Sequence, residues 1–114
     1  KLIGADVLPD DQKLVLDIAK VIRVGFLQQN AFHKDDTSVP LIKQFKMMDV
    51  ILYLYQKSKA LVHQGMPMSV LHQDSIWDKV TSIKYDVPND KLEMLDQYKK
   101  DIDTFYEKVL EKNA

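Results

Sequence analysis

The stretch VPLIKQFKMMDVILYLYQKSKALVHQG, residues 39–65, decides the fold. Its apolar residues recur at spacings of three and four, as they do along one face of an α-helix. This face consists of Leu41, Phe45, Met48, Leu52 and Tyr55. Four further residues widen the apolar surface, namely Met47, Val50, Ile51 and Leu54. We therefore expect this helix to be the buried centre of the domain, beginning near Pro40 and ending at Gly65.

The residues before this stretch predict a second amphipathic helix. Pro9, Asp10 and Asp11 are typical of a helix N-terminus, where the helix dipole favours negative charge. From there the apolar face comprises Leu14, Ile18, Val21, Ile22 and Gly25. We expect this helix to run to about Gln28.

The residues after it predict shorter helices and then one more long helix. Ser69 to His72 are enough for one turn, and a short helix around Ile76 to Ile83 should end before Pro88. Asn89 and Asp90 can cap a final helix. Its apolar seam has heptad spacing and consists of Leu95, Tyr98, Ile102, Phe105 and Val109. No strand or hairpin pattern competes, so residues 1–114 predict a single all-α domain, a bundle of about four to five helices.

Composition excludes several classes of function. The chain has 114 residues, of which 46% are hydrophobic, and a formal net charge of -1 from 16 basic and 17 acidic side chains. Charge-driven binding to nucleic acid or to an anionic membrane is therefore not expected. Cysteine is absent, which removes disulfides and thiolate chemistry and favours an intracellular location. No apolar run approaches the roughly 20 residues that cross a bilayer.

Catalytic motifs are also missing. The sequence has no glycine-rich phosphate loop, no nucleophile elbow and no zinc-binding helix, and its three histidines, His33, His63 and His72, stand at unrelated spacings. We therefore assign no catalytic residue and no metal ligand. Because the sequence does not begin with Met, we expect it to be a piece of a longer protein.

One short segment carries more specific chemistry: FLQQNAF, residues 26–32. It places Phe32 beside the side-chain amides of Gln29 and Asn30, which offer both hydrogen-bond donors and acceptors. Such a pairing suits a planar heteroaromatic ring, which stacks on an aromatic face and forms hydrogen bonds at its edge. The alternative is a helix C-terminus whose phenylalanines fill the core while the amides satisfy carbonyl groups.

The segment FLQQNAF resembles a signature in the C-terminal helical domain of the catalytic A (alpha) subunit of archaeal/vacuolar-type rotary ATPases. GADVLPD at residues 4–10, Asp36-Thr37 with Pro40, and KQFKM at residues 43–47 are also similar to that family, as are, more loosely, Met66-Pro67 and residues 83–85. The resemblance implies that Phe32 lies against the adenine of a bound nucleotide and that Asn30, Ala31 and Gln29 form the neighbouring wall. Phe26 would belong to the core.

The same resemblance implies a role in energy coupling. Asp6, Val7, Leu8, Asp10 and Asp11 correspond to an acidic segment that pushes on the central stalk, although the same acids suit a helix N-terminus. ATP or ADP with Mg would be bound only by the complete subunit, whereas this chain alone would bind neither. The implied partners are the upstream nucleotide-binding domain, which is absent here, the B subunits of an alternating hexamer, and the central-stalk subunits.

In the cell such a protein would be cytoplasmic and peripheral to the membrane. It would couple ATP synthesis or hydrolysis to rotation and to proton or sodium transport through a separate membrane sector. Two other interpretations remain open. In one, the chain is a free-standing interaction module whose seam at residues 95–109 binds a partner helix without any nucleotide. In the other it is a complete small enzyme, which only scattered His and Asp residues would favour.

Overall fold

The structure, a computed structural model, describes residues 8–27, 39–72 and 75–113. Its elements are α1 (Asp10–Val21), the π-helical segment η2 (Ile22–Leu27), α2 (Leu41–His63), α3 (Met68–Leu71), α4 (Ile76–Thr81), α5 (Ile83–Asp86) and α6 (Met94–Asn113). Within these ranges there is no β-strand. The predicted all-α fold is confirmed.

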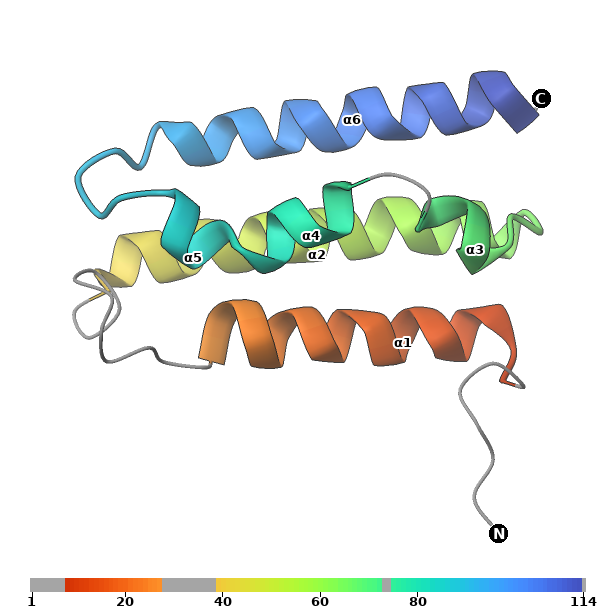
Figure 1. The fold of residues 1–114 in the computed structure, drawn as a ribbon, viewed down its shortest axis with the longest axis horizontal. Coiled ribbons are helices and arrows are strands. Elements are labelled where there is room, and N and C mark those ends of the chain that lie inside the picture. Colours follow the sequence, from red (N-terminus) through yellow and green to blue (C-terminus); the bar gives the residue numbers. More distant parts are fainter. Residues whose placement is uncertain (1–7, 28–38, 73–74, 114) are drawn as a thin grey trace, which may run out of the picture.

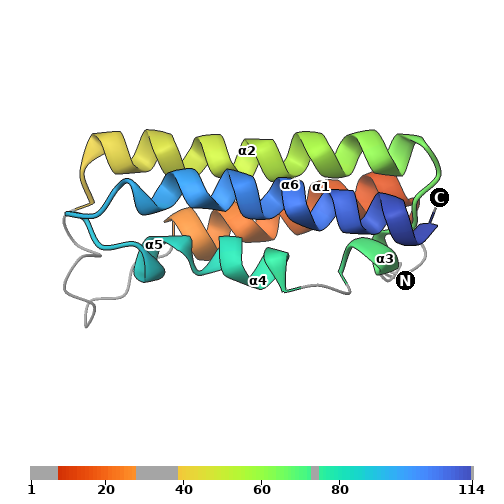
Figure 2. The same cartoon turned by 90° about the horizontal axis from the view of Figure 1, so that it is seen from above.

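The helices form an antiparallel bundle of rods that lie side by side (Figures 1 and 2). Three of the rods are α1 continued by η2, α2, and α6, and the fourth is built from the short helices α3, α4 and α5. Helix α2 packs against both α1 and α6, and α4 closes the opposite side by packing against the same two rods. Successive rods run in opposite directions, so that η2, the beginning of α2 and the link between α5 and α6 all lie at one end (Figure 1).

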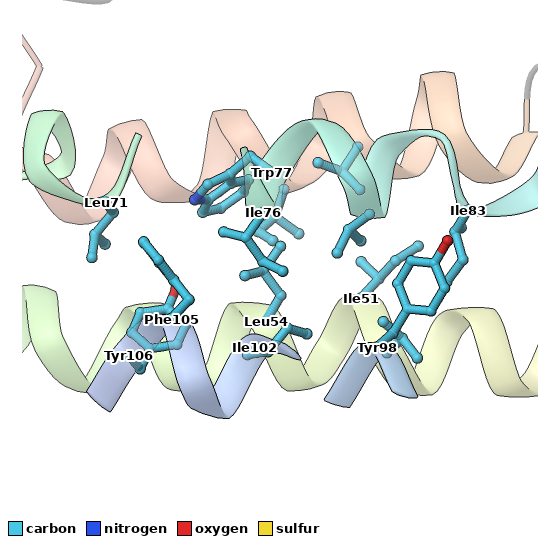
Figure 3. Close-up of a cluster of buried hydrophobic side chains, with 14 of the residues drawn as sticks. Ile51, Leu54, Leu71, Ile76, Trp77, Ile83, Tyr98, Ile102, Phe105 and Tyr106 are labelled. Atoms are coloured by element: carbon cyan, nitrogen blue, oxygen red, sulfur yellow. The ribbon is translucent and has the colours of Figure 1, made fainter. Parts of the chain in front are cut away.

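The core lies between α1, α2, α4 and α6, and Figure 3 shows the part shared by α2, α4 and α6. Ile51 and Leu54 from α2 meet Ile102 from α6, with Ile76 and Trp77 from α4 above them, and all five side chains are buried. Burying a large apolar side chain contributes about 1.5–3 kcal/mol relative to leaving it in water. This shared interior holds the short α4 in place, because a helix of six residues has little stability of its own.

The sequence prediction for α2 is only partly correct. Met47, Val50, Ile51 and Leu54 are buried as expected. The three-four stripe, however, points outward: Leu41 and Phe45 are each 65% exposed and Leu52 is 44% exposed, while Met48 and Tyr55 are half-buried. At about 100° per residue this stripe lies roughly 140° around the helix axis from the buried face. Helix α2 therefore has two apolar faces, and only one of them is used inside the bundle.

The helix ends follow the predicted signals. Pro9 precedes α1, and its carbonyl accepts hydrogen bonds of 3.0 Å from the amides of Gln12 and Lys13. Gly65 has a φ of +98°, the left-handed conformation that closes a helix, two residues after α2 ends at His63. Pro9 therefore marks the start of α1, and Gly65 marks the end of α2.

Two details differ from the sequence prediction. The expected short helix over residues 76–83 is divided into α4 and α5 at Ser82, where Thr81 donates its hydroxyl to the carbonyl of Trp77 over 2.7 Å. Helix α6 begins at Met94 and not at Asn89. The side-chain oxygen of Asn89 accepts a hydrogen bond from Lys43 (2.9 Å), so this amide has a tertiary partner instead of serving as a cap.

Candidate functional site

The residues predicted to contact adenine, Gln29, Asn30, Ala31 and Phe32, lie outside the described residues. The structure does describe the two elements that flank them. Helix η2 ends at Leu27, and Val39 and Pro40 lead directly into α2. Both flanks lie at the same end of the bundle, together with the link between α5 and α6 (Figure 1). We call this end, formed by η2, the first turns of α2 and residues 87–90, the apical end.

A buried lysine holds the apical end together. Lys43, in the first turn of α2, is fully buried. Its Nζ donates to the carbonyl oxygen of Lys84 (3.0 Å), the carbonyl oxygen of Val87 (2.6 Å) and Oδ1 of Asn89 (2.9 Å). These three acceptors match the three N–H donors of a protonated ammonium group. Because Lys84 and Val87 are in and just after the last turn of α5, the cation also lies at the negative end of that short helix.

This role of Lys43 was not predicted, although its position in the sequence carries a signal. Lys43 is four residues before Met47 and seven before Val50, so it is in phase with the buried face and not with the exposed one. A charged residue in that phase must either find polar partners inside or unfold the first turn. The acceptors come from a turn more than forty residues away, and the sequence pattern does not reveal that turn.

The other flank is fixed by a close backbone contact. Gly25 in η2 is buried, and a Cβ atom at this position would lie 2.5 Å from the carbonyl oxygen of Thr81 in α4. Any larger residue would therefore push η2 away from α4. This contact and the lysine contacts fix both ends of the segment that contains residues 29–32.

Of the predicted stalk-contacting residues, those that the structure describes, Leu8, Asp10 and Asp11, lie at the other end of α1. Asp6 and Val7 are outside the described residues, whereas Leu8 is half-buried and Asp11 is exposed. Asp10 lies 3.8 Å from Lys13, and Asp11 accepts a hydrogen bond of 2.9 Å from the amide of Gln12. These contacts are those of a helix N-terminus. The 12 residues of α1 separate the acidic tip at Asp10 and Asp11 from the apical end, which begins at η2, by about 18 Å, at 1.5 Å per residue.

Polar contacts brace the rods along their length. Between α2 and α6, the hydroxyl of Tyr53 donates to Asp103, which also lies 3.4 Å from Lys57. The hydrogen bond from Tyr53 lowers the pKa of Asp103, and that bond together with burial raises the pKa of Tyr53. Lys99 of α6 lies 2.6 Å from Asp49 of α2. The result is a row of cross-links on the outer seam of these two helices.

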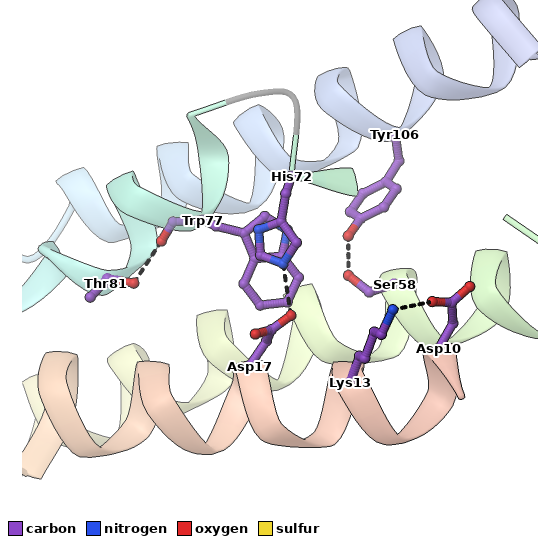
Figure 4. A network of polar contacts seen from close by, with 8 residues as sticks. All are labelled: Asp10, Lys13, Asp17, Ser58, His72, Trp77, Thr81 and Tyr106. Atoms are coloured by element: carbon purple, nitrogen blue, oxygen red, sulfur yellow. Dashed lines mark hydrogen bonds and ion pairs between the residues drawn. The ribbon is translucent and has the colours of Figure 1, made fainter. Parts of the chain in front are cut away.

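Figure 4 shows two further polar contacts between rods. His72 lies 2.7 Å from Asp17 of α1, and its ring packs against Trp77 with centroids 4.9 Å apart. Ser58 of α2 and Tyr106 of α6 share a buried hydrogen bond, and burial raises the pKa of Tyr106 to about 12. Together these contacts connect α1 to the short helices and α2 to α6.

Two shallow hollows lie on the α4–α6 side of the bundle. They have volumes of about 210 and 330 Å³ and meet at the ion pair between Lys79 and Asp101. The hydrogen bond from Lys79 lowers the pKa of Asp101. In the described part of the chain no three His, Asp or Glu side chains come together to hold a metal ion. Nor do residues 8–27, 39–72 and 75–113 include a helix long and apolar enough to span a membrane.

Comparisons with known proteins agree with this architecture. The sequence model of the family described as the C-terminal domain of V and A type ATP synthase matches residues 1–71. The chain is 40% identical to V-type ATP synthase alpha chain 2 of Clostridium tetani and 37% identical to the V-type ATP synthase alpha chain of Halothermothrix orenii. It is 35% identical to the A subunit of the A-type ATP synthase of Methanopyrus kandleri. Each match covers 97% of this chain and 19% of the relative.

The chain belongs to the family of C-terminal domains of V- and A-type ATP synthases, as its resemblance had suggested. It spans about a fifth of the length of these relatives. The residues of the α6 seam, from Leu95 to Val109, are buried within the bundle itself. The seam is therefore occupied by intramolecular packing, and a free-standing module that uses it to bind a partner helix is not favoured.

Proposed function

We propose that this chain acts as the C-terminal helical domain of the catalytic A subunit of a rotary ATP synthase or ATPase. The observation that carries the proposal is the match to V- and A-type ATP synthase subunits along 97% of the chain, together with the family model that matches residues 1–71. The geometry supports it, because the segment containing residues 29–32 begins and ends at a fixed apical end. A binding wall gains affinity when its supports are already ordered before the ligand arrives.

In the proposed site, the ring of Phe32 stacks on the adenine of ATP or ADP, and the amides of Gln29 and Asn30 face the edge of the base. Ala31 completes the wall. Binding of Mg and of the phosphates would fall to a preceding nucleotide-binding domain, as the family resemblance implies. The helical domain described here would contribute affinity and orientation at the adenine base. The bond to the γ-phosphate would be formed or broken in the nucleotide-binding domain.

We also propose that α1 and η2 transmit the motion that follows nucleotide binding. The apical end and the acidic tip are opposite ends of one rod, which α2 and α4 hold along its length. Movement of the wall at residues 29–32 would then move Asp6, Val7, Leu8, Asp10 and Asp11 as one body against a basic partner such as the central stalk. A rod that is packed on two sides can carry such a displacement without bending.

In the assembled enzyme, the partners would be the nucleotide-binding domain of the same polypeptide, B subunits in an alternating hexamer, and the central stalk. The complex would be peripheral to the membrane on the cytoplasmic side. Proton or sodium transport would occur in a separate membrane sector, coupled through rotation.

The adenine contact is tested by replacing Phe32 in the full-length protein. Phe32→Ala should weaken ATP binding by about 1–3 kcal/mol, the usual contribution of a base stacked on an aromatic side chain. Phe32→Tyr keeps the ring and is the matched control, expected to bind ATP nearly as the parent does. Equal affinities for the parent and the alanine variant would contradict the assignment.

The contact with the stalk has a separate test. A photoreactive group attached at Asp11→Cys in the assembled complex should cross-link to a protein of the central stalk. The same group at Lys91→Cys, an exposed position next to the apical end, serves as the control and should not cross-link. Absence of a cross-link from position 11 to any stalk protein would contradict the assignment, and equal cross-linking of positions 11 and 91 would show that the contact is not specific to the acidic tip.

A further inference from the structure

The larger of the two hollows, between α4, α5 and α6, carries a negative charge that the fold does not neutralise. Its volume is about 330 Å³, and the side chains that line it are Lys79, Asp86, Met94, Gln97, Tyr98 and Asp101. We call these six residues the acidic hollow. Lys79 pairs with Asp101, which also accepts a hydrogen bond of 3.0 Å from Gln97. Asp86, at the end of α5, is exposed and forms no ion pair within the described ranges.

A buried tyrosine points into the same hollow. Tyr98 is 5% exposed, and Figure 3 shows its hydroxyl directed from α6 towards Ile83 of α5. Within the part of the chain that the structure describes, this hydroxyl has no hydrogen-bond partner. Burial and then the charges of Asp86 and Asp101 raise the pKa of Tyr98 to about 12, so both carboxylates act on the hydroxyl. Because buried polar groups normally have a hydrogen-bond partner, this hydroxyl marks the hollow as a place where a ligand completes the bonding.

We propose that the acidic hollow receives an arginine side chain of a partner protein. The guanidinium group donates to the carboxylate of Asp86 and to the hydroxyl oxygen of Tyr98, and it neutralises the charge that Lys79 leaves uncompensated. Arginine suits several acceptors at once because its five N–H donors lie in one plane. The ammonium group of a lysine has the same charge but only three donors on a single atom.

The size of the acidic hollow favours one side chain over a whole small molecule. Pockets that bury small molecules usually have volumes of about 300–1,000 Å³. This hollow is at the lower limit of that range and is shallow, so it would leave most of a larger ligand in water. Met94, which is 40% exposed, offers an apolar wall for the methylene groups of an arginine. A protein that presents an arginine on its surface therefore matches both the charge and the dimensions.

The test is a titration of the chain with N-acetyl-arginine amide, followed by amide chemical shifts. This probe carries the arginine side chain as it occurs within a polypeptide, and N-acetyl-citrulline amide is a neutral control of nearly the same shape. We expect the arginine probe to saturate shifts at Asp86 and at residues 94–101 with a Kd of roughly 1–10 mM, as suits one partly exposed charge pair. The citrulline probe should leave these shifts unchanged. Free arginine represents a small-molecule source of the same group and should bind no more tightly than the capped probe.

Variants locate the binding. Asp86→Asn should weaken the arginine probe by about three- to tenfold and Tyr98→Phe by about two- to fivefold, because each removes one hydrogen-bonding group from the hollow. Asp78→Asn, at an exposed acid of α4 outside the hollow, is the matched control and should bind as the parent does.

Four results would overturn the proposal: no saturable shift at the hollow, equal shifts with the citrulline probe, unchanged affinity in Asp86→Asn or Tyr98→Phe, and tighter binding of free arginine, which would make a small molecule the occupant. The shifts are observed on α5 and α6 without nucleotide. Their outcome is therefore independent of the adenine contact at residues 29–32.

Discussion

Replacement of Lys43 by Met measures how strongly the buried ammonium group stabilises the apical end. Methionine keeps an unbranched apolar chain of similar length but removes the donor of all three hydrogen bonds. A buried acceptor that loses its partner costs about 1–3 kcal/mol. Removing the cation also relieves the cost of burying a charge, which amounts to several kcal/mol. The loss of three hydrogen bonds should outweigh the relief from burying one charge, so we expect Lys43→Met to lower the free energy of unfolding by about 2–4 kcal/mol.

The assay is urea denaturation of the chain followed by far-ultraviolet circular dichroism. The midpoint should fall while its slope stays the same, because the surface exposed on unfolding does not change. In a thermal scan the melting temperature should fall by about 4 °C for each kcal/mol of stability lost in a domain of this size. Lys46→Met is the control, because this lysine is three residues further along the helix and makes one weak ion pair, of 4.0 Å, with an exposed carboxylate. Its replacement should lower the free energy of unfolding by less than about 0.5 kcal/mol. A Lys43→Met variant as stable as the parent would show that desolvation of the ammonium outweighs its hydrogen bonds.

Three further predictions concern stability. Gly25→Ala should destabilise the fold by about 1–3 kcal/mol in the same urea assay, because the new Cβ meets the carbonyl of Thr81; a gain in stability, as helix propensity alone would give, would contradict the contact. Burial, reinforced by nearby aspartates, raises the pKa of Tyr98 to about 12, the value also reached by Tyr106. An unfolded tyrosine has a pKa near 10, so the stability that comes from keeping Tyr98 and Tyr106 neutral is complete below about pH 10 and is lost as the pH rises towards 12. Phenolate absorbance should show that at least two of the five tyrosines ionise above the pH at which an unfolded tyrosine does. The hydrogen bond from Tyr53 lowers the pKa of Asp103, so its contribution is present above about pH 4 and is lost as the pH falls further; Asp103→Asn should flatten that acid slope, and an unchanged slope would exclude the bond.

The sequence predicts the rods well because each long helix has a continuous apolar face and clear end signals. Pro9, Gly65 and the seam of α6 have the roles that their positions indicated. The prediction fails where one helix carries two apolar faces. In α2 the stripe containing Leu41 and Phe45 has the regular spacing, yet the less regular face with Met47 is the buried one. Periodicity shows that a face is apolar but does not show which neighbour covers it.

The apical contacts could not be predicted for a different reason. Lys43 and Gly25 contact backbone carbonyl groups that are distant in the sequence, and Asn89 contacts the distant side chain of Lys43; such partners leave no trace in local spacing. The resemblance of residues 26–32 identified the family, which the comparisons confirmed. The adenine wall at residues 29–32 stays a prediction, because these residues lie outside the part of the chain that the structure describes.

Photolabelling with 2-azido-ATP tests most directly whether this domain forms part of the adenine pocket. Cleavage after Arg23 and Lys34 releases residues 24–34 as one tryptic peptide that contains Gln29, Asn30, Ala31 and Phe32. In the full-length protein we expect the label on this peptide, and we expect excess ATP to abolish it. Labelling that is confined to other parts of the protein, with residues 24–34 unmodified, would contradict the account.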